Sequence, residues 1–340
     1  MIRVVIVDDS AIVRDLLKMV LENDPEIKVV GTARGGKQAI DIIPDVKPDI
    51  VLMDLKMPDM DGFQTVRHIM GYFPVPILVI SSVFSKNSDL MFQIFECGAL
   101  DFIEKPSFAF LENNFSAANE LINKVKILAK VKVVSSLIAK SKKRKVLTFT
   151  KSNVSGKKVI AIVSSTGGPG ALRKIIPLLP KNFPAGIIVV QHITQGFIGG
   201  LVDWLQKLSE IKIRIACEND IIGPGEVLFA PDGCHVILDA KGRIKFENSP
   251  PVGGVRPSAD ILFPSMSKYY GSSLIGVIMT GMGDDGVRGM ECIKKGGGAT
   301  IAQNEESCIV FGMPKAAIER GIIDKVVPLH KIPETIIKLL

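Results

Sequence analysis

The chain has 340 residues, 47% of them hydrophobic, which is enough for about two domains with full cores and excludes wholesale disorder. No apolar run reaches the roughly 20 residues that span a bilayer, so direct membrane insertion is excluded. The first ten residues are typical of a strand followed by acids, not of a signal peptide, and we expect a cytoplasmic protein.

The net charge of +7 comes from one segment. Residues 124–158 hold twelve Lys or Arg and no Asp or Glu, whereas the other residues carry 30 basic and 35 acidic side chains. Such a segment is either a solvated linker or a nucleic-acid-binding arm. The lack of interleaved aromatic side chains and of a second basic surface favours the linker, so we expect no nucleic-acid partner.

The first 120 or so residues alternate between strand and helix patterns. Helical spacing of apolar residues predicts helices over about 13–21, 36–43, 62–70 and 88–96, with another after residue 109. Short apolar runs predict strands at 2–7, 28–31, 50–53, 77–81 and 99–103. Regular alternation implies an α/β fold with a five-stranded, doubly wound parallel sheet and right-handed crossovers.

Polar side chains follow four of these strands. Asp8 and Asp9 follow the first, Asp54 the third, Ser81 ends the fourth and Lys105 follows the fifth. Ligands of doubly wound sheets bind at the carboxyl ends of the strands. Three carboxylates at one edge repel one another unless a cation lies among them, and such oxygen ligands suit Mg²⁺, while the lysine and the hydroxyl suit a phosphoryl group. Each acid alone could instead cap a helix.

The motifs V-D-D-S, M-D-L-K-M-P-D-M-D-G, S-S and D-F-I-E-K-P resemble a bacterial response-regulator receiver domain over about residues 1–122. The resemblance implies that Asp54 accepts a phosphoryl group from a histidine kinase. It also implies that Asp8, Asp9 and Asp54 hold Mg²⁺. It implies Ser81 as the switch hydroxyl, Phe102 as the aromatic switch residue and Lys105 as the counter-charge of the phosphate.

Residues 123–157 form the predicted basic linker, and the alternation resumes over 158–340. A less regular part, residues 212–246, holds short strands and a hairpin that turns at Lys241 and Gly242. Strands are predicted at 159–163, 187–191, 274–279, 299–303 and 325–328. These patterns predict a second doubly wound parallel sheet, of roughly seven strands.

The segment Val159–Leu172 is an apolar strand that ends in two hydroxyls, Ser164 and Ser165, before Thr, two Gly and Pro. A hydroxyl on a tight turn from a strand into a helix is well placed for acyl chemistry, because the amides of the helix start can stabilise an oxyanion. The alternative is a strand-to-helix loop with a Ser/Thr cap.

Two further strand ends carry His192 and the pair Asp284 and Asp285, which would complete a serine–histidine–aspartate triad. The order Ser, His, Asp and the missing G-x-S-x-G frame exclude the α/β-hydrolase fold. His235 is a competing base, ranked second because it follows a turn instead of a long apolar strand. Spacing does not separate Ser164 from Ser165, or Asp284 from Asp285.

The motifs S-T-G-G-P-G-A-L, V-V-Q-H-I, A-P-D-G-C-H, R-P-S-A-D-I-L-F, M-T-G-M-G-D-D-G and A-Q-N-E-E-S-C-I-V-F-G-M-P are similar to the catalytic domain of chemotaxis protein-glutamate methylesterases of the CheB type. The resemblance implies Ser165 as nucleophile, His192 as base and Asp285 as the acid that orients it. The residues implied for the oxyanion site are Thr166, Gly167 and Met282.

The two resemblances together imply a phosphorylation-activated serine hydrolase. It would demethylate glutamate methyl esters and deamidate glutamines on the cytoplasmic domains of chemoreceptors, with no cofactor at the hydrolase site. The receiver is expected to cover the second domain until Asp54 is phosphorylated and Phe102 moves. The alternative is a non-catalytic response regulator that acts through nucleic-acid or protein binding.

Overall fold

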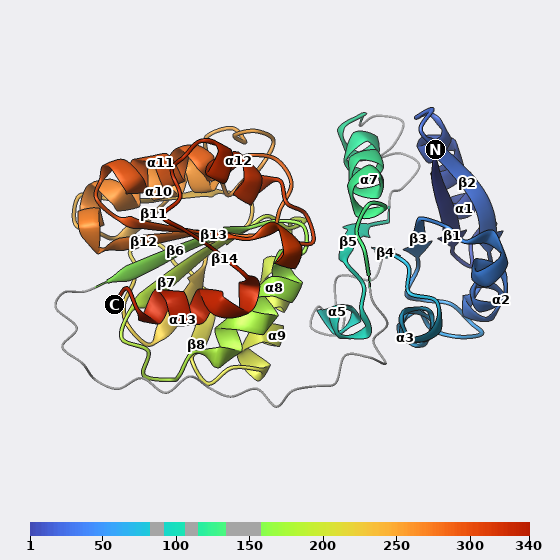
Figure 1. Cartoon of the computed structure of the whole chain (residues 1–340), viewed down its shortest axis with the longest axis horizontal. Coiled ribbons are helices and arrows are strands. Elements are labelled where there is room, and N and C mark those ends of the chain that lie inside the picture. The colour runs from blue at the N-terminus through green and yellow to red at the C-terminus, as the bar shows by residue number, and fades with distance from the viewer. Residues whose placement is uncertain (82–91, 106–114, 134–157) are drawn as a thin grey trace. The chain divides into compact units, whose positions relative to one another are not determined.

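The computed structural model describes residues 1–81, 92–105, 115–133 and 158–340 (Figure 1). The chain forms two compact units, Met1–Lys142 and Lys143–Leu340, each built on a parallel β-sheet. The predicted α/β class with two doubly wound domains is therefore confirmed. Within the described ranges, no helix combines the length and the apolar composition that crossing a bilayer requires.

The first unit is a five-stranded parallel sheet with the strand order β2-β1-β3-β4-β5. Its inner strands are apolar and buried over residues 4–7, 50–53 and 77–80, as expected of parallel strands with helices on both faces. This order places the end of β1 beside the end of β3, where ligands of such sheets bind. The strands are β1 (Ile2–Val7), β2 (Ile27–Ala33), β3 (Ile50–Met53), β4 (Ile77–Ser81) and β5 (Asp101–Glu104).

The helices of the first unit pack in groups, α1 with α7 and α3 with both α2 and α5. Helix α3 begins where the Asp61 carboxylate accepts a hydrogen bond from the backbone N–H of Gln64 at 2.7 Å. Residues 88–91 of the helix predicted over 88–96 lie outside the described residues, and its last three residues fall in α5. The helices are α1 (Ala11–Glu22), α2 (Gly36–Val46), α3 (Gly62–Tyr72), α5 (Ile94–Cys97) and α7 (Phe115–Leu128).

Helix α7 continues past the domain boundary predicted at residue 122. Its Val125 and Leu128 are fully buried, and the ammonium of Lys124 lies 3.1 Å from the Asp101 carboxylate of β5. The first unit therefore extends into the predicted linker, because the apolar face of this helix belongs to its core. Most of the linker, residues 134–157, lies outside the described part of the chain.

The second unit is a seven-stranded parallel sheet, with the order β14-β13-β12-β6-β7-β9-β8, and a separate antiparallel hairpin. Its strands are β6 (Val159–Ser164), β7 (Gly186–Gln191), β8 (Lys212–Ile215), β9 (Glu226–Phe229), β12 (Leu274–Ile278), β13 (Ala299–Gln303) and β14 (Lys325–Val327). The hairpin pairs β10 (His235–Leu238) with β11 (Ile244–Glu247), so the turn predicted at Lys241 and Gly242 is confirmed.

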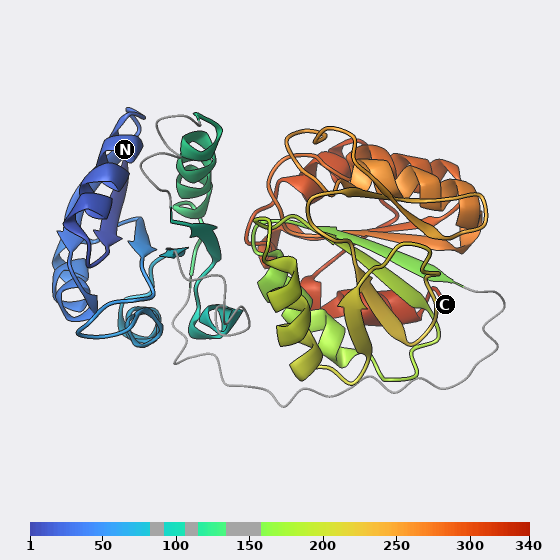
Figure 2. The same ribbon diagram turned by 180° about the vertical axis from the view of Figure 1, so that it is seen from behind.

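The helices of the second unit cover both faces of its sheet, with α10, α11 and α12 on one face and α8, α9 and α13 on the other (Figures 1 and 2). Helix α8 ends at Ile175, and the chain continues as a 3₁₀ turn over Ile176–Leu178, where Pro177 has no backbone N–H to donate. The helices are α8 (Gly168–Ile175), α9 (Ile198–Lys207), α10 (Ala259–Tyr270), α11 (Val287–Lys295), α12 (Met313–Glu319) and α13 (Ile332–Ile337).

The core between the sheet and α10–α11 is apolar and reaches the ends of the central strands. Alternate residues of β6, Val159, Ala161 and Val163, belong to one buried cluster with Phe263 of α10 and Met290 of α11. The strand ends that follow are therefore held on a rigid support, which positions their polar side chains.

Candidate sites at the strand ends of the two sheets

The acidic residues of the first unit meet at one point, as predicted. Carboxylate oxygens of Asp8, Asp9 and Asp54 lie within 4.8 Å of one another. Asp54 is buried at the end of β3, and its Oδ1 accepts the backbone N–H of Leu55 at 2.8 Å. The Lys105 ammonium lies 2.9 Å from Asp54 Oδ2 and 2.6 Å from Asp8 Oδ2.

The charges in this cluster are strongly coupled. Burial raises the pKa of Asp54 above its usual range, and the nearby Asp8 carboxylate adds to the effect, although Lys105 opposes it. Burial alone would lower the pKa of Lys105, but its hydrogen bonds to Asp8 and Asp54 and their charges raise it. The lysine therefore stays charged, and it offsets the charge of only one of the three carboxylates.

The cluster fits a divalent cation. Asp8 Oδ2 is buried, and the donor that faces it is the Lys105 ammonium, 2.6 Å away. Three carboxylates that can each offer one oxygen within this small space are the donor set that Mg²⁺ prefers. The residues present are therefore compatible with the predicted Mg²⁺ site.

The two predicted switch residues lie on β4 and β5. Phe102 is buried in β5, where its ring makes edge-on contacts with the rings of Phe92 and Phe95, at centroid distances of 5.9 and 6.1 Å. Ser81 is the last residue of β4 and pairs with Glu104, but its side chain lies outside the described part of the structure.

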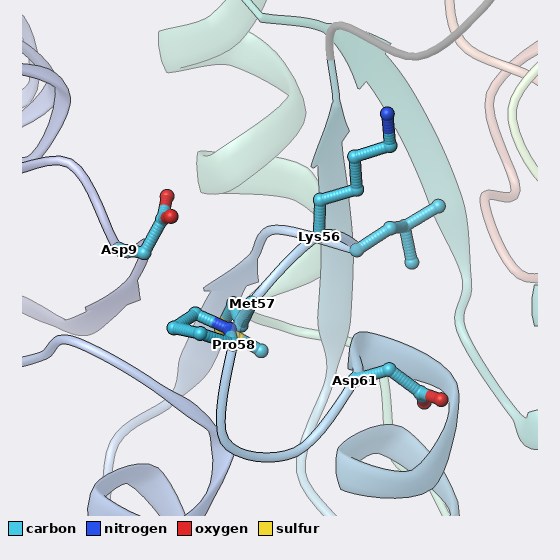
Figure 3. A pocket seen from close by; sticks show the side chains of 6 residues that line it. Asp9, Lys56, Met57, Pro58 and Asp61 are labelled. Atoms are coloured by element: carbon cyan, nitrogen blue, oxygen red, sulfur yellow. The ribbon is translucent and has the colours of Figure 1, made fainter.

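A pocket of about 370 Å³ opens beside the cluster (Figure 3). Asp9 lies on one side, and the loop between β3 and α3 forms the other side, with Met57 and Pro58 at its base and Asp61 at the start of α3. The loop follows directly after Asp54, so the pocket gives solvent access to the rim of the acidic cluster.

In the second unit, the two serines at the end of β6 have different surroundings. Ser164 is fully buried, and its hydroxyl donates to Oε1 of Gln191 at 2.7 Å. Ser165 is partly exposed on the turn into α8, and its backbone N–H donates to Thr280 O at 3.0 Å. The turn is tight because Gly167 has a φ of 77°, a conformation that favours glycine. Of the two hydroxyls, only that of Ser165 is placed near the surface.

His192 and Asp285 form the contact that the strand-end pattern predicts. The Nε2 of His192 lies 2.9 Å from Oδ2 of Asp285, and both side chains are 9% exposed. The backbone N–H of His192 donates to Ser164 O at 2.9 Å, so β6 and β7 stay paired up to the histidine. Within the described residues, no hydrogen bond joins the Ser165 hydroxyl to His192, as is common before substrate binds.

The two adjacent aspartates also differ in their surroundings, as the two serines do. Asp284 is exposed, whereas Asp285 is largely buried. Burial would raise the pKa of Asp285, but the hydrogen bond and charge of His192, with donors from Ser258 and Ala259, lower it below its usual range. Asp285 is therefore held as a carboxylate that can accept the N–H of the histidine ring.

Three backbone amides predicted to bind an oxyanion surround the Ser165 turn. Those of Thr166 and Gly167 precede α8, and that of Met282 follows Gly281, whose own N–H donates to Val310 O. In the ranges that the structure covers, none of these three N–H groups has an acceptor. They are therefore available to a developing negative charge.

His235, the competing base, lies in the interior. It is fully buried, and both of its ring nitrogens have partners. The Ser258 N–H donates to Nδ1 at 3.1 Å, and Nε2 lies 3.1 Å from the Pro250 carbonyl oxygen. It therefore has no nitrogen left for a serine proton.

Sequence reasoning missed Gln191, whose side chain amide donates to the carbonyls of Ser165 at 2.9 Å and His192 at 2.8 Å. Its position as the one polar residue that ends the apolar strand β7 was a usable signal. A buried amide at the end of such a strand needs several partners.

Comparisons with known proteins agree with this geometry. The CheB methylesterase family model matches residues 160–336, and the response regulator receiver domain model matches residues 4–112. The protein-glutamate methylesterase/protein-glutamine glutaminase of Symbiobacterium thermophilum is 40% identical over 98% of this chain and 96% of its own length. The protein of the same name from Pyrococcus abyssi is 40% identical over 99% of this chain and 93% of its length.

A solved structure, the CheB methylesterase catalytic domain of Thermotoga maritima, is 44% identical with a TM-score of 0.53. It covers 55% of this chain and 100% of its own. The chain therefore belongs to the CheB family of protein-glutamate methylesterases/protein-glutamine glutaminases, with a receiver domain ahead of its methylesterase domain.

Proposed function

We propose that this chain is a phosphorylation-activated serine hydrolase that demethylates glutamate methyl esters and deamidates glutamines on chemoreceptors. Its relatives are named for both activities. The observation that carries the proposal is the His192–Asp285 hydrogen bond, which lies at the end of β7 beside the Ser165 turn. A non-catalytic regulator would not need a buried, charged aspartate held against a histidine at this position.

The hydrogen bond determines which nitrogen acts as the base. Asp285 is an ionised carboxylate and can only accept, so Nε2 of His192 carries a proton and donates this hydrogen bond. Nδ1 is then the unprotonated nitrogen, and it takes the proton of the Ser165 hydroxyl. Asp285 holds this tautomer and stabilises the charged ring that forms.

The reaction then follows acyl-transfer chemistry. The Ser165 oxygen attacks the ester carbon, and the carbonyl oxygen becomes an oxyanion that the amides of Thr166, Gly167 and Met282 stabilise. As the bond to the leaving group breaks, the protonated ring of His192 gives its proton to the methoxy oxygen, which departs as methanol, or to the amide nitrogen of a glutamine, which departs as ammonia. Water, activated by the same nitrogen, releases the glutamate and restores Ser165.

The first unit supplies the regulation. Asp54 accepts a phosphoryl group from a histidine kinase, and the Lys105 ammonium beside it stabilises the added charge. Asp8, Asp9 and Asp54 would hold Mg²⁺, which neutralises charge on the transferring phosphoryl group. That the unphosphorylated receiver blocks the second site stays a prediction.

Replacing Asp54 with asparagine is expected to abolish stimulation by a small phosphodonor such as acetyl phosphate while leaving basal methanol release unchanged. The amide cannot form an acyl phosphate, and Asp54 belongs to the first unit whereas Ser165, His192 and Asp285 belong to the second. Methanol release from methylated receptors, with and without the phosphodonor, measures this directly. Phosphodonor stimulation that survives in Asp54→Asn would show that another residue is the acceptor.

Replacing Gly281 with alanine is expected to lower kcat by at least about 10-fold. A Cβ at this position would lie 2.8 Å from Cβ of Ser165 and 2.3 Å from Sδ of Met313, so the nucleophile turn must shift. Small displacements of reacting groups have large effects on rate. Steady-state methanol release measures the change.

The control for this variant is Gly199→Ala in α9, where an added Cβ meets no atom within 4 Å. This variant is expected to keep wild-type kcat and to gain about 0.4–1 kcal/mol in stability, because alanine restricts the unfolded chain. Equal activity of Gly281→Ala and Gly199→Ala would contradict the close packing of Gly281 on Ser165.

A further inference from the structure

The R-P-S segment before α10 and the buried His235 take no part in the mechanism above. We propose that Ser258 is a positioning residue of this reaction, which holds the Asp285 carboxylate in the orientation that faces His192. The inference rests on the proposed roles of Ser165, His192 and Asp285, and it adds the residue that holds the Asp285 side chain in place.

Ser258 binds the carboxylate oxygen that His192 leaves free. Its hydroxyl donates to Oδ1 of Asp285, whereas Nε2 of His192 lies 2.9 Å from Oδ2. The backbone N–H of Ala259 donates to Oδ2 at 2.8 Å. With both oxygens bound by donors from separate elements, the carboxylate cannot rotate about its Cβ–Cγ bond without losing a hydrogen bond.

The position of Ser258 in the chain also favours the charged form of Asp285. Ser258 caps the N-terminus of α10, and its oxygen accepts the N–H of Asp260 at 3.1 Å. The carboxylate of Asp285 therefore lies at the positive end of a helix of twelve residues. Helix dipole and hydroxyl act in the same direction on a side chain that is only 9% exposed.

His235 holds Ser258 in turn. Nε2 of His235 faces the Pro250 carbonyl, which can only accept, so this nitrogen carries the proton and Nδ1 accepts the Ser258 N–H at 3.1 Å. Because Ser258 and His235 are both fully buried, solvent water does not reach them to replace these hydrogen bonds. A continuous series of contacts therefore runs from His235 through Ser258 and Asp285 to His192.

The test replaces Ser258 with alanine in the full chain, activated by acetyl phosphate, and measures kcat and KM for methanol release from methylated receptors. We expect kcat to fall about 10- to 100-fold, the range for losing one hydrogen bond to a buried charged group, with KM changed less than about twofold. If Ser258→Ala does not fold, Ser258→Gly serves, because glycine is tolerated at a helix cap.

The matched control is Ser267→Ala, which removes another buried hydroxyl from the same helix. Ser267 donates to Cys292 O at 2.8 Å, away from the triad. We expect this variant to lose thermal stability as Ser258→Ala does but to keep wild-type kcat. A kcat of Ser258→Ala within about twofold of wild type, or an equal loss in Ser267→Ala, would overturn the inference.

Asp285→Asn in the same assay separates the inference from the proposed function. If Asp285→Asn is inactive while Ser258→Ala keeps wild-type kcat, only the positioning role of Ser258 is wrong. If Asp285→Asn itself keeps wild-type kcat, the proposed triad is wrong, and the role of Ser258 falls with it.

Discussion

Replacing Ser165 with alanine is expected to lower the rate of methanol release from methylated receptors by about 10⁶-fold, the scale on which loss of a serine nucleophile acts in a triad enzyme. Without Oγ no acyl-enzyme forms. His192 then has no serine proton to accept, and no oxyanion from attack by the serine forms for the backbone amides to stabilise. Ser165 is the partly exposed hydroxyl at the end of β6, so it is the one that a receptor side chain can reach.

The neighbouring hydroxyl provides the control. Ser164→Ala removes a buried hydrogen bond to Gln191, which supports the same turn, and we expect a loss of about 1 kcal/mol in stability and less than about 10-fold in rate. The reverse pattern, with Ser164→Ala inactive and Ser165→Ala active, would place the nucleophile one residue earlier in the chain.

Replacing Asp285 with asparagine is expected to lower kcat by about 10⁴-fold, as for the aspartate of other triads. The neutral amide lacks the negative charge that stabilises the imidazolium formed when Nδ1 of His192 takes the proton of the Ser165 hydroxyl. The packing stays intact because the two side chains have the same shape.

Asp284→Asn makes the same chemical change one residue away, on an exposed side chain. We expect it to keep wild-type kcat to within about twofold, as exposed substitutions usually do. Stopped-time methanol release on both variants, with thermal unfolding to confirm that each is folded, gives the comparison. Equal losses in the two variants would contradict the assignment of the acid to Asp285.

Much of the fold follows from local patterns. Apolar runs such as Ile50–Met53 and Ala299–Gln303 coincide with β3 and β13, because strands covered by helices on both faces need uninterrupted apolar residues. The ends of β1 and β3 place Asp8 beside Asp54. The ends of β7 and β12, the two neighbours of β6, lead into His192 and Asp285, which contact each other. The end of α8 could not be predicted from the sequence, because Pro177 can follow a shortened helix or begin a 3₁₀ turn.

The choice within each pair of adjacent residues depended on tertiary structure. Ser164 and Ser165 share one spacing pattern, and only burial and the contact with Gln191 separate them. Asp284 and Asp285 are separated in the same way, by exposure and by the contact of Asp285 with His192. The resemblance to the methylesterases selects Ser165 and Asp285 at the level of sequence. In the structure Asp285, and not Asp284, contacts His192.

The partners of His235 and Ser258 could not be predicted from the sequence. They lie 23 residues apart, and they meet only because the hairpin packs against the start of α10. Long-range polar contacts of this kind have no periodicity, so a pattern of apolar residues contains no signal for them.

The most direct test of the account is methanol release from methylated receptors by the full chain, with and without acetyl phosphate, for the wild type and Ser165→Ala. We predict that the phosphodonor stimulates the wild type and that Ser165→Ala releases no methanol above background in either condition. Phosphodonor-stimulated methanol release by Ser165→Ala would contradict the account, because it would place the hydrolysis on another residue.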